Sequence, residues 1–387
     1  MFAATEQSDV DVASRQDEVE EKLRSVRSWL DDRGVVGVVL AGVDAVAWLT
    51  AGLTTPVERG ASVGPLRLVV THDIFAAVTT NVERPRLEAE AGLDRLGVTI
   101  HQAPWFEPGG LERVAAELSC RPPRELASDR APGFGVACDD DFVELRLTLA
   151  RPERERLERL AVDTAAALEG ALAAWRPGER DLDVLARVDE ALERVGAFAA
   201  CLIVGGDERV ERFRHPLACG AEMGRLVMAV AVAERDGLHA AATRFTCADG
   251  LPDGVAKAAA AARAVEEEML AASVPAATYG EVMQACERAY TVAGHPGAWR
   301  EHYQGGPIGY RQREFEIVPT QSDSRWFGTR LAVGQVLAWN PSVAGGGKAE
   351  DTYALEPGGL RRLTDTGRWP LEGGRPAILD LTTGVAA

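Results

Sequence analysis

The stretch that decides the fold is a glycine-rich segment with polar side chains at its start, His302-Tyr303-Gln304-Gly305-Gly306-Pro307-Ile308-Gly309-Tyr310. Two shorter segments precede it and two follow it: Arg214-His215-Pro216, Ala242-Thr243-Arg244, Trp339-Asn340-Pro341 and Glu350-Asp351-Thr352. Each tripeptide alone is a weak signal, because three residues recur by chance in many unrelated chains. The information lies in the order of the five segments and in the spacing between them.

The composition bounds the class of protein. A chain of 387 residues is long enough for two domains with complete hydrophobic cores. No apolar run approaches the roughly 18–20 residues that a membrane-spanning helix needs. The stretch from Met1 to Arg15 is polar and acidic, shows no signal or transit peptide, and is expected to be a short frayed tail. We therefore expect a cytoplasmic protein with no membrane partner.

The charge and the cysteines narrow the possible partners. A formal net charge of −17 disfavours nucleic acid, since an acidic protein repels the phosphate backbone. Six cysteines are scattered along the chain without a C-x-x-C pair, so they support neither a zinc knuckle nor a redox motif. They are typical of reduced cysteines in a cytosolic protein.

The first part of the chain, residues 1–145, predicts a small α/β domain. Apolar residues at helical spacing between 19 and 30 precede Gly34, a plausible helix stop, and the apolar run 35–40 is typical of a strand buried on both faces. More strands are expected at 66–71, 75–79 and 98–100, and helices at 84–96 and 111–119. Residues 121–140 contain three prolines and two glycines, which is typical of a linker.

The second part, residues 146–387, predicts an α+β domain with helices packed over a curved antiparallel sheet. Helices are expected at 152–175, 182–195, 253–273 and 279–293, and strands at 199–205 and 225–233. The remainder reads as strands and loops. Two helices followed by strands occur twice in this order, which suggests an internal duplication without a visible sequence repeat.

The five segments, in this order and at roughly this spacing, resemble those of the creatinase, prolidase and aminopeptidase P family, whose catalytic domain has the pita-bread fold. The resemblance covers nearly the whole chain. It implies an α+β fold class, with a pita-bread domain over residues 146–387 and a smaller creatinase-like α/β domain over residues 1–145. Fold alone does not decide the activity, because function depends on the site.

The metallopeptidases of this family hold two metal ions with two Asp, one His and two Glu residues, since hard divalent cations need that much carboxylate. Counted from Thr243-Arg244, the two Asp positions hold Val230 and Ala241, or Ala231 and Ala242 after a slip of one residue. The His position holds Gly306 and the first Glu position holds Asn340; Glu350 is the one ligand retained. We therefore expect no dinuclear metal and no other cofactor.

A replacement metal site is conceivable around Glu234, Asp236 and His239, whose spacing would suit a hairpin. The alternative, a solvated turn at Asp236-Gly237, is favoured because nothing else near them in sequence supplies further ligands.

Two residues are candidates for catalysis. His215 matches a family histidine that contacts the scissile group and that, in creatinase, acts as acid and base in a C–N hydrolysis without metal. Imidazole suits that task because its ordinary pKa lies near 6.5. Glu350 matches a creatinase carboxylate that binds the cationic end of the substrate. The alternatives are a histidine that caps a loop beside Pro216 and a solvated charge in a glycine-rich loop.

The candidate substrate-binding residues are mostly cationic or amide side chains. Guanidinium groups grip carboxylates with a planar fork, so several near one pocket would favour an anionic group and, with Glu350, a zwitterion. Arg313 also stands where the metallopeptidases carry a proton-shuttling histidine, and His302 stands where the family often has a histidine that contacts substrate or product. Taken singly, each can be structural. The set is Arg214, Arg244, Arg313, His302, Gln304 and Asn340.

Arg59 resembles a creatinase arginine that reaches into the active site of the neighbouring subunit, although the local spacing differs by about one residue. This resemblance implies a homodimer with composite sites.

Three functions fit these residues. The first is a metal-independent C–N bond hydrolase with the logic of creatinase, acting on a small zwitterionic, amino-acid- or peptide-like substrate. The second is an Xaa-Pro aminopeptidase or dipeptidase with metals. The third is a catalytically silent pita-bread binding protein, as in the peptidase-like domain of a histone chaperone. The missing ligands disfavour the second, and His215 with Glu350 favours the first over the third.

Overall fold

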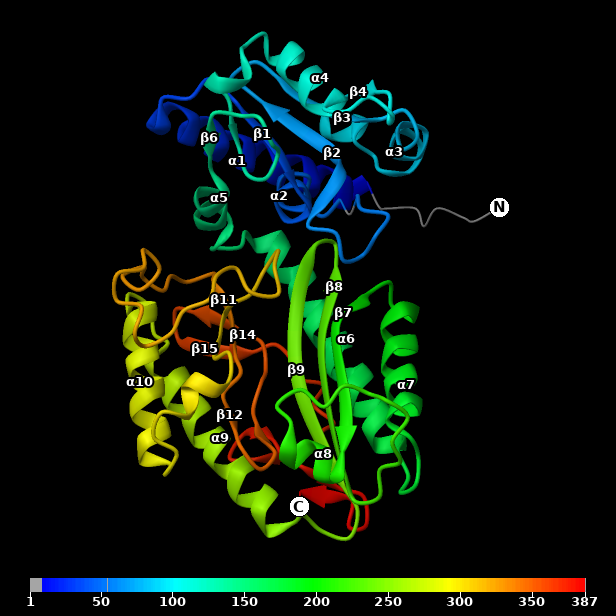
Figure 1. Cartoon of the computed structure of the whole chain (residues 1–387), viewed down its shortest axis with the longest axis vertical. Helices are drawn as coiled ribbons and strands as arrows, with labels where there is room; N and C mark the ends of the chain where they lie inside the picture. The colour runs from blue at the N-terminus through cyan, green and yellow to red at the C-terminus, as the bar shows by residue number, and fades with distance from the viewer. Residues whose placement is uncertain (1–8, 54, 387) are drawn as a thin grey trace. The chain divides into compact units, whose positions relative to one another are not determined.

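The chain forms two units, residues 1–153 and 154–387, and the computed structural model describes residues 9–53 and 55–386 (Figure 1). The division near residue 145 that the sequence predicts lies at the end of helix α5 (Asp139–Arg146), which belongs to the first unit here. Among the described residues, no helix has the length and apolar character needed to cross a bilayer.

The N-terminal unit begins with a long helix, α1 (Asp9–Arg33). It ends as the sequence predicts, because Gly34 adopts φ +63, a left-handed conformation that glycine tolerates without strain. Because α1 begins at Asp9, residues 9–15 are helical rather than part of the frayed tail that the sequence predicts. Residues 1–8, where the rest of that tail would be, lie outside the described residues.

A six-stranded sheet in the order β4-β3-β2-β1-β5-β6 forms the centre of this unit. The central strand β1 pairs antiparallel with β2 and parallel with β5, and all of its residues are buried, as the apolar run predicts. The strands are β1 (Val38–Gly42), β2 (Val63–Val70), β3 (Phe75–Thr80), β4 (Thr99–Ala103), β5 (Ala127–Ser128) and β6 (Val136–Ala137). Short helices connect them: α2 (Val43–Leu49), α3 (Arg84–Glu90) and α4 (Gly110–Ser119).

Residues 121–140 are not the linker that their prolines and glycines predict. They contain β5 and β6, which extend the sheet, and Leu126 packs in the core between the sheet and α4. At Gly135 an added Cβ would lie 2.0 Å from the carbonyl oxygen of Arg124, so this glycine permits close packing of two backbone segments. Glycine and proline shape tight turns inside the domain here.

The C-terminal unit repeats an order of two helices followed by strands. The first set is α6 (Arg151–Ala174), α7 (Asp181–Arg194), β7 (Phe198–Gly206), β8 (Leu226–Arg235) and β9 (Leu238–Cys247), with the short helix α8 (Asp207–Arg212) after β7. The second set is α9 (Asp253–Ala272), α10 (Tyr279–Val292), β10 (Gly305–Pro307), β11 (Val336–Trp339), β14 (Tyr353–Glu356) and β15 (Gly359–Arg362). The four long helices lie where the sequence predicts them.

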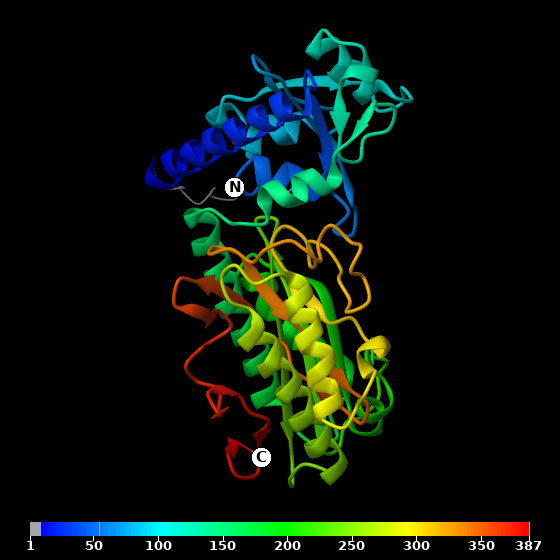
Figure 2. The ribbon, with the colours of Figure 1, turned by 90° about the vertical axis from the view of Figure 1, so that its left-hand side faces the viewer.

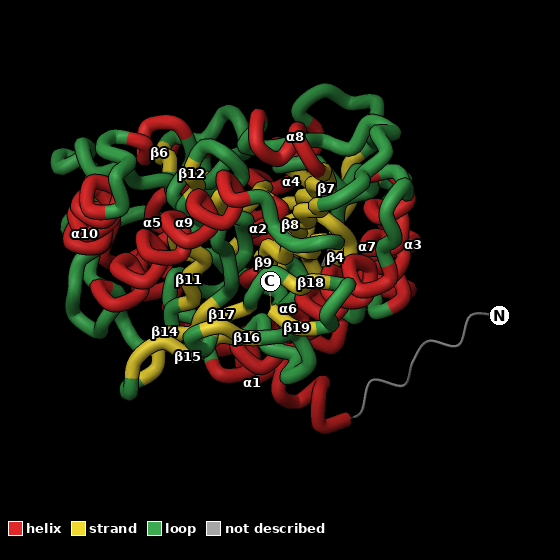
Figure 3. Tube along the Cα trace, turned by 90° about the horizontal axis from the view of Figure 1, so that it is seen from below, coloured by secondary structure: helices red, strands yellow, loops and turns green. Residues whose placement is uncertain are grey.

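Helices cover this unit on two sides. Seen from below, α9 and α10 lie on one side of β8 and β9, and α7 lies on the other (Figure 3). Figure 2 shows α9 and α10 side by side, and α9 contributes Val255 and Ala259 to an apolar core with Met228 and Phe245 of the sheet. The sheet order is β19-β18-β9-β8-β7. Its last two strands in the chain are β18 (Leu379–Asp380) and β19 (Val385–Ala386).

A second, smaller sheet carries part of the glycine-rich segment 302–310 and Trp339, and it lies near β9. Its order is β10-β11-β14-β15, and the hairpin β12 (Ser342–Val343) and β13 (Gly347–Lys348) follows β11. The remaining short strands, β16 (Leu371–Glu372) and β17 (Arg375–Pro376), pair with each other. The backbone N–H of Thr243 in β9 donates to the carbonyl oxygen of Glu350 at 2.9 Å, which ties the two parts of the unit together.

Candidate functional site

The positions where the resemblance implies two Asp ligands lie in the hairpin of β8 and β9. Val230 is paired with Thr243 and Ala241 with Val232, so both sit inside the antiparallel ladder. Val230 is buried in the apolar core beside Met228 and Phe245. The slipped alternatives, Ala231 and Ala242, pair with each other and are equally aliphatic. Neither register supplies an oxygen or nitrogen ligand.

Gly306 lies at the position of the family histidine, and the side chain of Arg313 passes near it. A Cβ at Gly306 would lie 4.0 Å from Arg313 Cδ and 3.3 Å from the carbonyl oxygen of Phe315. Arg313 Nη1 donates to the carbonyl oxygen of Ala338 at 3.2 Å, and Nη2 lies 3.7 Å from Glu350 Oε1. A guanidinium therefore stands beside the one carboxylate that is retained.

Glu350 itself is buried and held in a fixed position. Its Oε2 accepts a hydrogen bond from Thr243 Oγ1 at 3.0 Å, and Glu350 as a whole is 3% exposed. With Arg313 near Oε1, part of its charge is already offset by the protein. The structure thus places Glu350 in the site, with Thr243 as the residue that orients it.

Lys348 lies in the candidate site, although the family segments do not point to it. It is 7% exposed, and its ammonium Nζ lies 3.3 Å from His302 Nε2. Burial, opposed in part by Glu350, lowers the pKa of Lys348. A signal was present, because Lys348 stands two residues before Glu350, and alternate residues of an extended segment share a face.

His215 and His302 form a contacting pair. Their Nε2 atoms lie 3.2 Å apart, and the ring centroids lie 5.0 Å apart. His302 Nδ1 is within hydrogen-bond distance of the carbonyl oxygen of Tyr303, so Nδ1 carries the proton and Nε2 is the acceptor. That Nε2 accepts from His215 or from Lys348, both of which lie within reach.

Both imidazoles are shifted toward the neutral form. Burial, reinforced by the charge of Lys348, lowers the pKa of His302 to about 2. Burial and then Lys348 also lower the pKa of His215, while Glu350 acts in the opposite direction. His215 is the more exposed of the two and is therefore the one that can exchange a proton with solvent or with a ligand.

Cys201 of β7 lies near this group and interacts electrostatically with Glu350, Lys348 and Arg313. Burial raises the pKa of its thiol, which keeps it protonated and disfavours a nucleophilic role.

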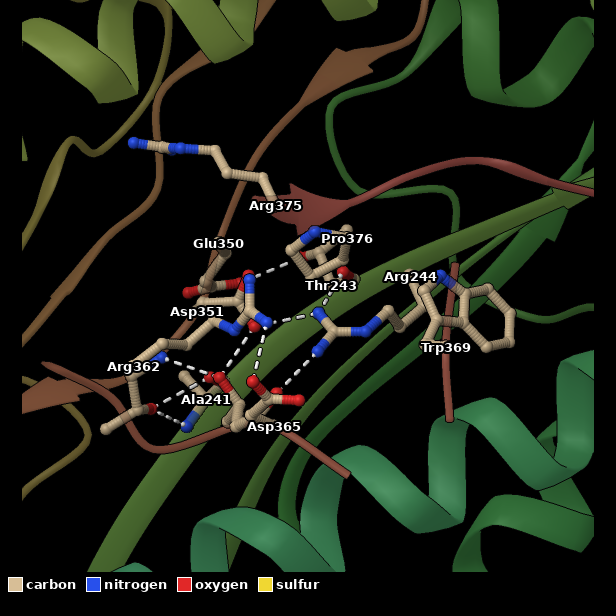
Figure 4. A network of polar contacts seen from close by, with 12 residues as sticks. Ala241, Thr243, Arg244, Glu350, Asp351, Arg362, Asp365, Trp369, Arg375 and Pro376 are labelled. Carbon is tan, nitrogen blue, oxygen red and sulfur yellow. Dashed lines mark hydrogen bonds and ion pairs between the residues drawn. The ribbon is translucent and has the colours of Figure 1, made fainter. Parts of the chain in front are cut away.

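Two of the predicted substrate-binding residues are committed to the fold. Arg244, 1% exposed, donates to Asp351 Oδ1 at 2.8 Å (Figure 4). It also donates to Glu169 Oε1 at 3.2 Å and to two carbonyl oxygens. Gln304 is fully buried, donates to the carbonyl oxygens of Trp299 and His302, and accepts from Tyr290 and Cys286. Gln304 uses all of its donors and acceptors, and Arg244 uses four of its five N–H donors. These contacts disfavour the substrate role expected for both residues, which stays a prediction.

Arg214 and Asn340 differ in how far their polar atoms are engaged by the protein. Arg214 Nη1 donates to Ser342 Oγ at 3.2 Å and Nη2 pairs with Glu301 at 2.7 Å, so its side chain lies beside the β12–β13 hairpin that carries Lys348. Asn340 is 7% exposed, and its Oδ1 has no hydrogen-bond partner among the described residues. An unpartnered buried acceptor is costly unless a ligand or water meets it.

Arg59 lies apart from this group in the sequence and in the N-terminal unit. It is exposed in the turn between α2 and β2. Whether it reaches a second subunit stays a prediction.

The residues present do not fit the dinuclear centre that the family implies. Four of the five positions offer an aliphatic side chain, a glycine or an amide, and two cations, Lys348 and Arg313, stand near the remaining carboxylate. Within the described residues, no cluster of three His, Cys, Asp or Glu side chains is arranged to hold an ion. His239 lies 3.6 Å from Glu234, whereas Asp236 sits in the turn, with φ +55.

The fold of the C-terminal unit is the pita-bread fold, and the N-terminal unit is the smaller α/β domain that precedes it in such proteins. The model of metallopeptidase family M24 matches residues 155–365, more than half of the chain. The protein therefore belongs to the M24 family.

Solved structures show the same architecture at low sequence identity. Prolidase from Thermococcus sibiricus aligns with a TM-score of 0.72 at 14% identity, over 91% of this chain and 97% of its own. Dipeptidase PepE from Mycobacterium ulcerans aligns with a TM-score of 0.71 at 18% identity, over 90% and 96%. The N-terminal domain of the FACT complex subunit SPT16 from chickpea aligns with a TM-score of 0.69 at 11% identity, over 96% and 99%. None of the curated proteins compared matches the chain.

Proposed function

We propose that the protein hydrolyses a C–N bond in a small amino-acid- or peptide-like substrate without a dinuclear metal centre. The observation that carries this proposal is that protein cations lie in the site where the family has metal ligands. Where the family's ligands would surround two cations, this chain has aliphatic side chains and a glycine, and it brings the ammonium of Lys348 and the guanidinium of Arg313 near Glu350. A fixed positive charge can stabilise the oxyanion that develops during hydrolysis.

His215 is the proposed proton-transfer residue. In its neutral form it takes a proton from water, whose oxygen bonds to the substrate carbon. The same proton then passes to the nitrogen as the C–N bond breaks. His302 supports this role because its Nε2 is an acceptor 3.2 Å from His215 Nε2 and can hold His215 in the tautomer that leaves Nδ1 as the base.

Glu350 and Asn340 are the proposed contacts for the substrate nitrogen. Since Arg313 already offsets part of the charge of Glu350, the carboxylate suits an amide N–H or a weakly cationic amine better than a strongly paired cation. The unpartnered Oδ1 of Asn340 offers a second acceptor. His302, Arg214 and Arg313 complete the proposed substrate-binding set.

A metal-dependent Xaa-Pro dipeptidase or aminopeptidase is the second candidate. The M24 family match and the structural similarity to prolidases favour it, because the members with these names share the fold over nearly their whole length. A silent binding protein is the third candidate, favoured by the similarity to the SPT16 domain of the FACT complex over 96% of the chain.

One experiment separates the three candidates. The chelator-treated protein is assayed by mass spectrometry against prolyl dipeptides and N-substituted glycines, with and without added Mn²⁺ or Co²⁺. We expect turnover of an N-substituted glycine or related substrate that added metal does not change. Turnover of prolyl dipeptides that requires added metal would establish the second candidate, and no turnover of any substrate would leave the third.

The proposed partner is a second copy of the chain, as the resemblance of Arg59 implies. Light scattering of the purified protein should give about twice the monomer mass, and a monomer would end this proposal.

A further inference from the structure

A cavity lies beside the candidate site. It has a volume of about 170 Å³ and is lined on its polar side by Arg214, Ser342, Lys348 and the glycine-rich turn 345–347. Phe213, Met228 and Val343 give it apolar walls. Since Lys348 also contacts His302, the cavity adjoins the proposed catalytic pair.

Lys348 is the unusual group in this cavity. Its single hydrogen-bond partner among the described residues is His302 Nε2, and no carboxylate of the described chain lies within 4.0 Å of Nζ. Lysine side chains are rarely buried to this degree without a counter-ion. Lys348 is held in this place by the β12–β13 hairpin, where it pairs with Ser342.

The carboxylates nearby are engaged with other cations. Glu350 binds Thr243 and lies beside Arg313, and Glu301 pairs with Arg214 at 2.7 Å. Removing an ammonium group from water without a paired anion is costly, so a ligand that supplies the anion gains affinity from this site.

We propose that this cavity is a binding subsite for a monocarboxylate ligand that carries an apolar group. The Lys348 ammonium binds the carboxylate, Arg214 supplies a second donor at the edge, and Phe213 and Met228 contact the apolar group. A single negative charge fits better than a phosphate, because Glu211 and Glu301 also line the cavity and repel a dianion. This inference deepens the proposed function, on which it rests for the position of the reacting nitrogen.

The affinity can be measured without turnover, so the test is separate from that of the proposed hydrolysis. Isothermal titration calorimetry on the full chain compares N-acetyl-L-phenylalanine with its amide, which has nearly the same shape but replaces one carboxylate oxygen by an uncharged NH2 group. We expect the carboxylate to bind roughly 10–100-fold more tightly than the amide, the value of a hydrogen-bonded charge. Lys348→Met should remove most of that difference.

Matched controls complete the design. Lys257→Met removes an exposed lysine of α9 and should leave both affinities unchanged. Arg214→Met should weaken the carboxylate several-fold, and it serves as the second variant if Lys348→Met does not fold. His215→Ala should retain binding while losing turnover, so that binding and catalysis fail independently.

The proposal is wrong if carboxylate and amide bind equally, if neither binds at millimolar concentration, or if a folded Lys348→Met variant binds as the wild type does. Inorganic phosphate is included in the same titrations. Phosphate that binds more tightly than the carboxylate would overturn the assignment to a monocarboxylate.

Discussion

At the residue scale, the site is defined by which charges are close together. Lys348 and Arg313 are near Glu350, and His215 contacts His302, which Lys348 also contacts. In the proposed mechanism, Lys348 and Arg313 supply positive charge to a developing oxyanion in place of metal ions. His215 is left as the exposed group with a proton-accepting nitrogen.

His215→Ala should lower kcat by roughly 10²- to 10⁴-fold, the usual contribution of general acid–base catalysis, while KM changes little. The check is steady-state kinetics on the substrate found in the metal experiment. His72→Ala, which changes an exposed histidine of the N-terminal unit, is the control. A loss of less than about tenfold for His215→Ala would move the proton transfer to another residue.

Glu350→Gln should impair both binding and rate while the fold stays intact. The amide keeps an acceptor for Thr243 Oγ1, but it removes the negative charge beside Arg313 and leaves that guanidinium less balanced. We expect a loss of at least about tenfold in kcat/KM, because an interaction with a charged group is removed. Unchanged circular dichroism with unchanged kinetics would exclude Glu350 from the substrate contacts.

His302 should make the protein less stable in acid. Its pKa in the folded state is about 2, below the ordinary 6.5, so the unfolded chain takes up a proton that the folded chain refuses. The contribution of His302 to the free energy of unfolding is therefore complete above pH 6.5. It is lost as the pH falls toward 2, by up to about 1.4 kcal/mol per pH unit. Urea unfolding between about pH 7.5 and 5 should show a steeper loss for the wild type than for His302→Gln. Parallel curves would contradict the neutral, buried state of His302.

At the scale of secondary structure, Arg244 of β9 connects helix α6 with the segment after β13. Its guanidinium pairs with Asp351 (Figure 4) and with Glu169 of α6. Asp351 also accepts a hydrogen bond from Thr364. Asp351 follows Glu350 directly, so this buried network also determines where Glu350 lies. The arginine acts on the site through position.

Arg244→Met should destabilise the C-terminal unit by about 3–5 kcal/mol, because it leaves two carboxylates in the interior without their cation. Arg361→Met is the matched control: Arg361 also pairs with two carboxylates, Glu158 and Glu356, but its side chain is 45% exposed. The control should cost less than about 1 kcal/mol. Chemical denaturation of both variants measures the difference, and equal costs would show that the buried network contributes no more than a surface pair.

At the scale of the whole molecule, the chain has the M24 fold, while the residues at four of the five expected ligand positions do not fit a metal centre. The pita-bread scaffold depends on the sheet and helix cores, and these cores include Val230 among their members. The same aliphatic residues that prevent ligation therefore contribute to stability. A fold can be maintained by packing after its site has changed.

The residues at the expected ligand positions also predict the metal content of the protein. We expect the purified chain to contain well under one equivalent of Mn, Co or Zn, and chelators to leave its stability and turnover unchanged. Inductively coupled plasma mass spectrometry and thermal unfolding with and without chelator make the measurement. Two equivalents per chain, or a lower unfolding temperature after chelation, would contradict the proposed metal independence.

Much of the fold could be predicted from the sequence, because periodicity and short segments are local properties. The four long helices of the C-terminal unit lie where the sequence predicts them, and β1 is buried as its apolar run predicts. Residues 121–140 were interpreted as a linker because proline and glycine break helices everywhere, whereas their pairing with β1 depends on a strand about 90 residues away. Long-range pairing of this kind leaves little local trace.

By itself the sequence determined the family, which the family model confirms. It also predicted the missing ligands and the candidates His215 and Glu350, since each depends on residue identity at a position along the chain. The tertiary structure decided which polar groups are still available. Arg244 and Gln304 are engaged by hydrogen-bond partners that are distant in sequence or buried in the core. Lys348 is a candidate ligand-binding group because it is buried beside His302. Availability depends on burial and on hydrogen-bond partners, and both are properties of the packed chain in three dimensions.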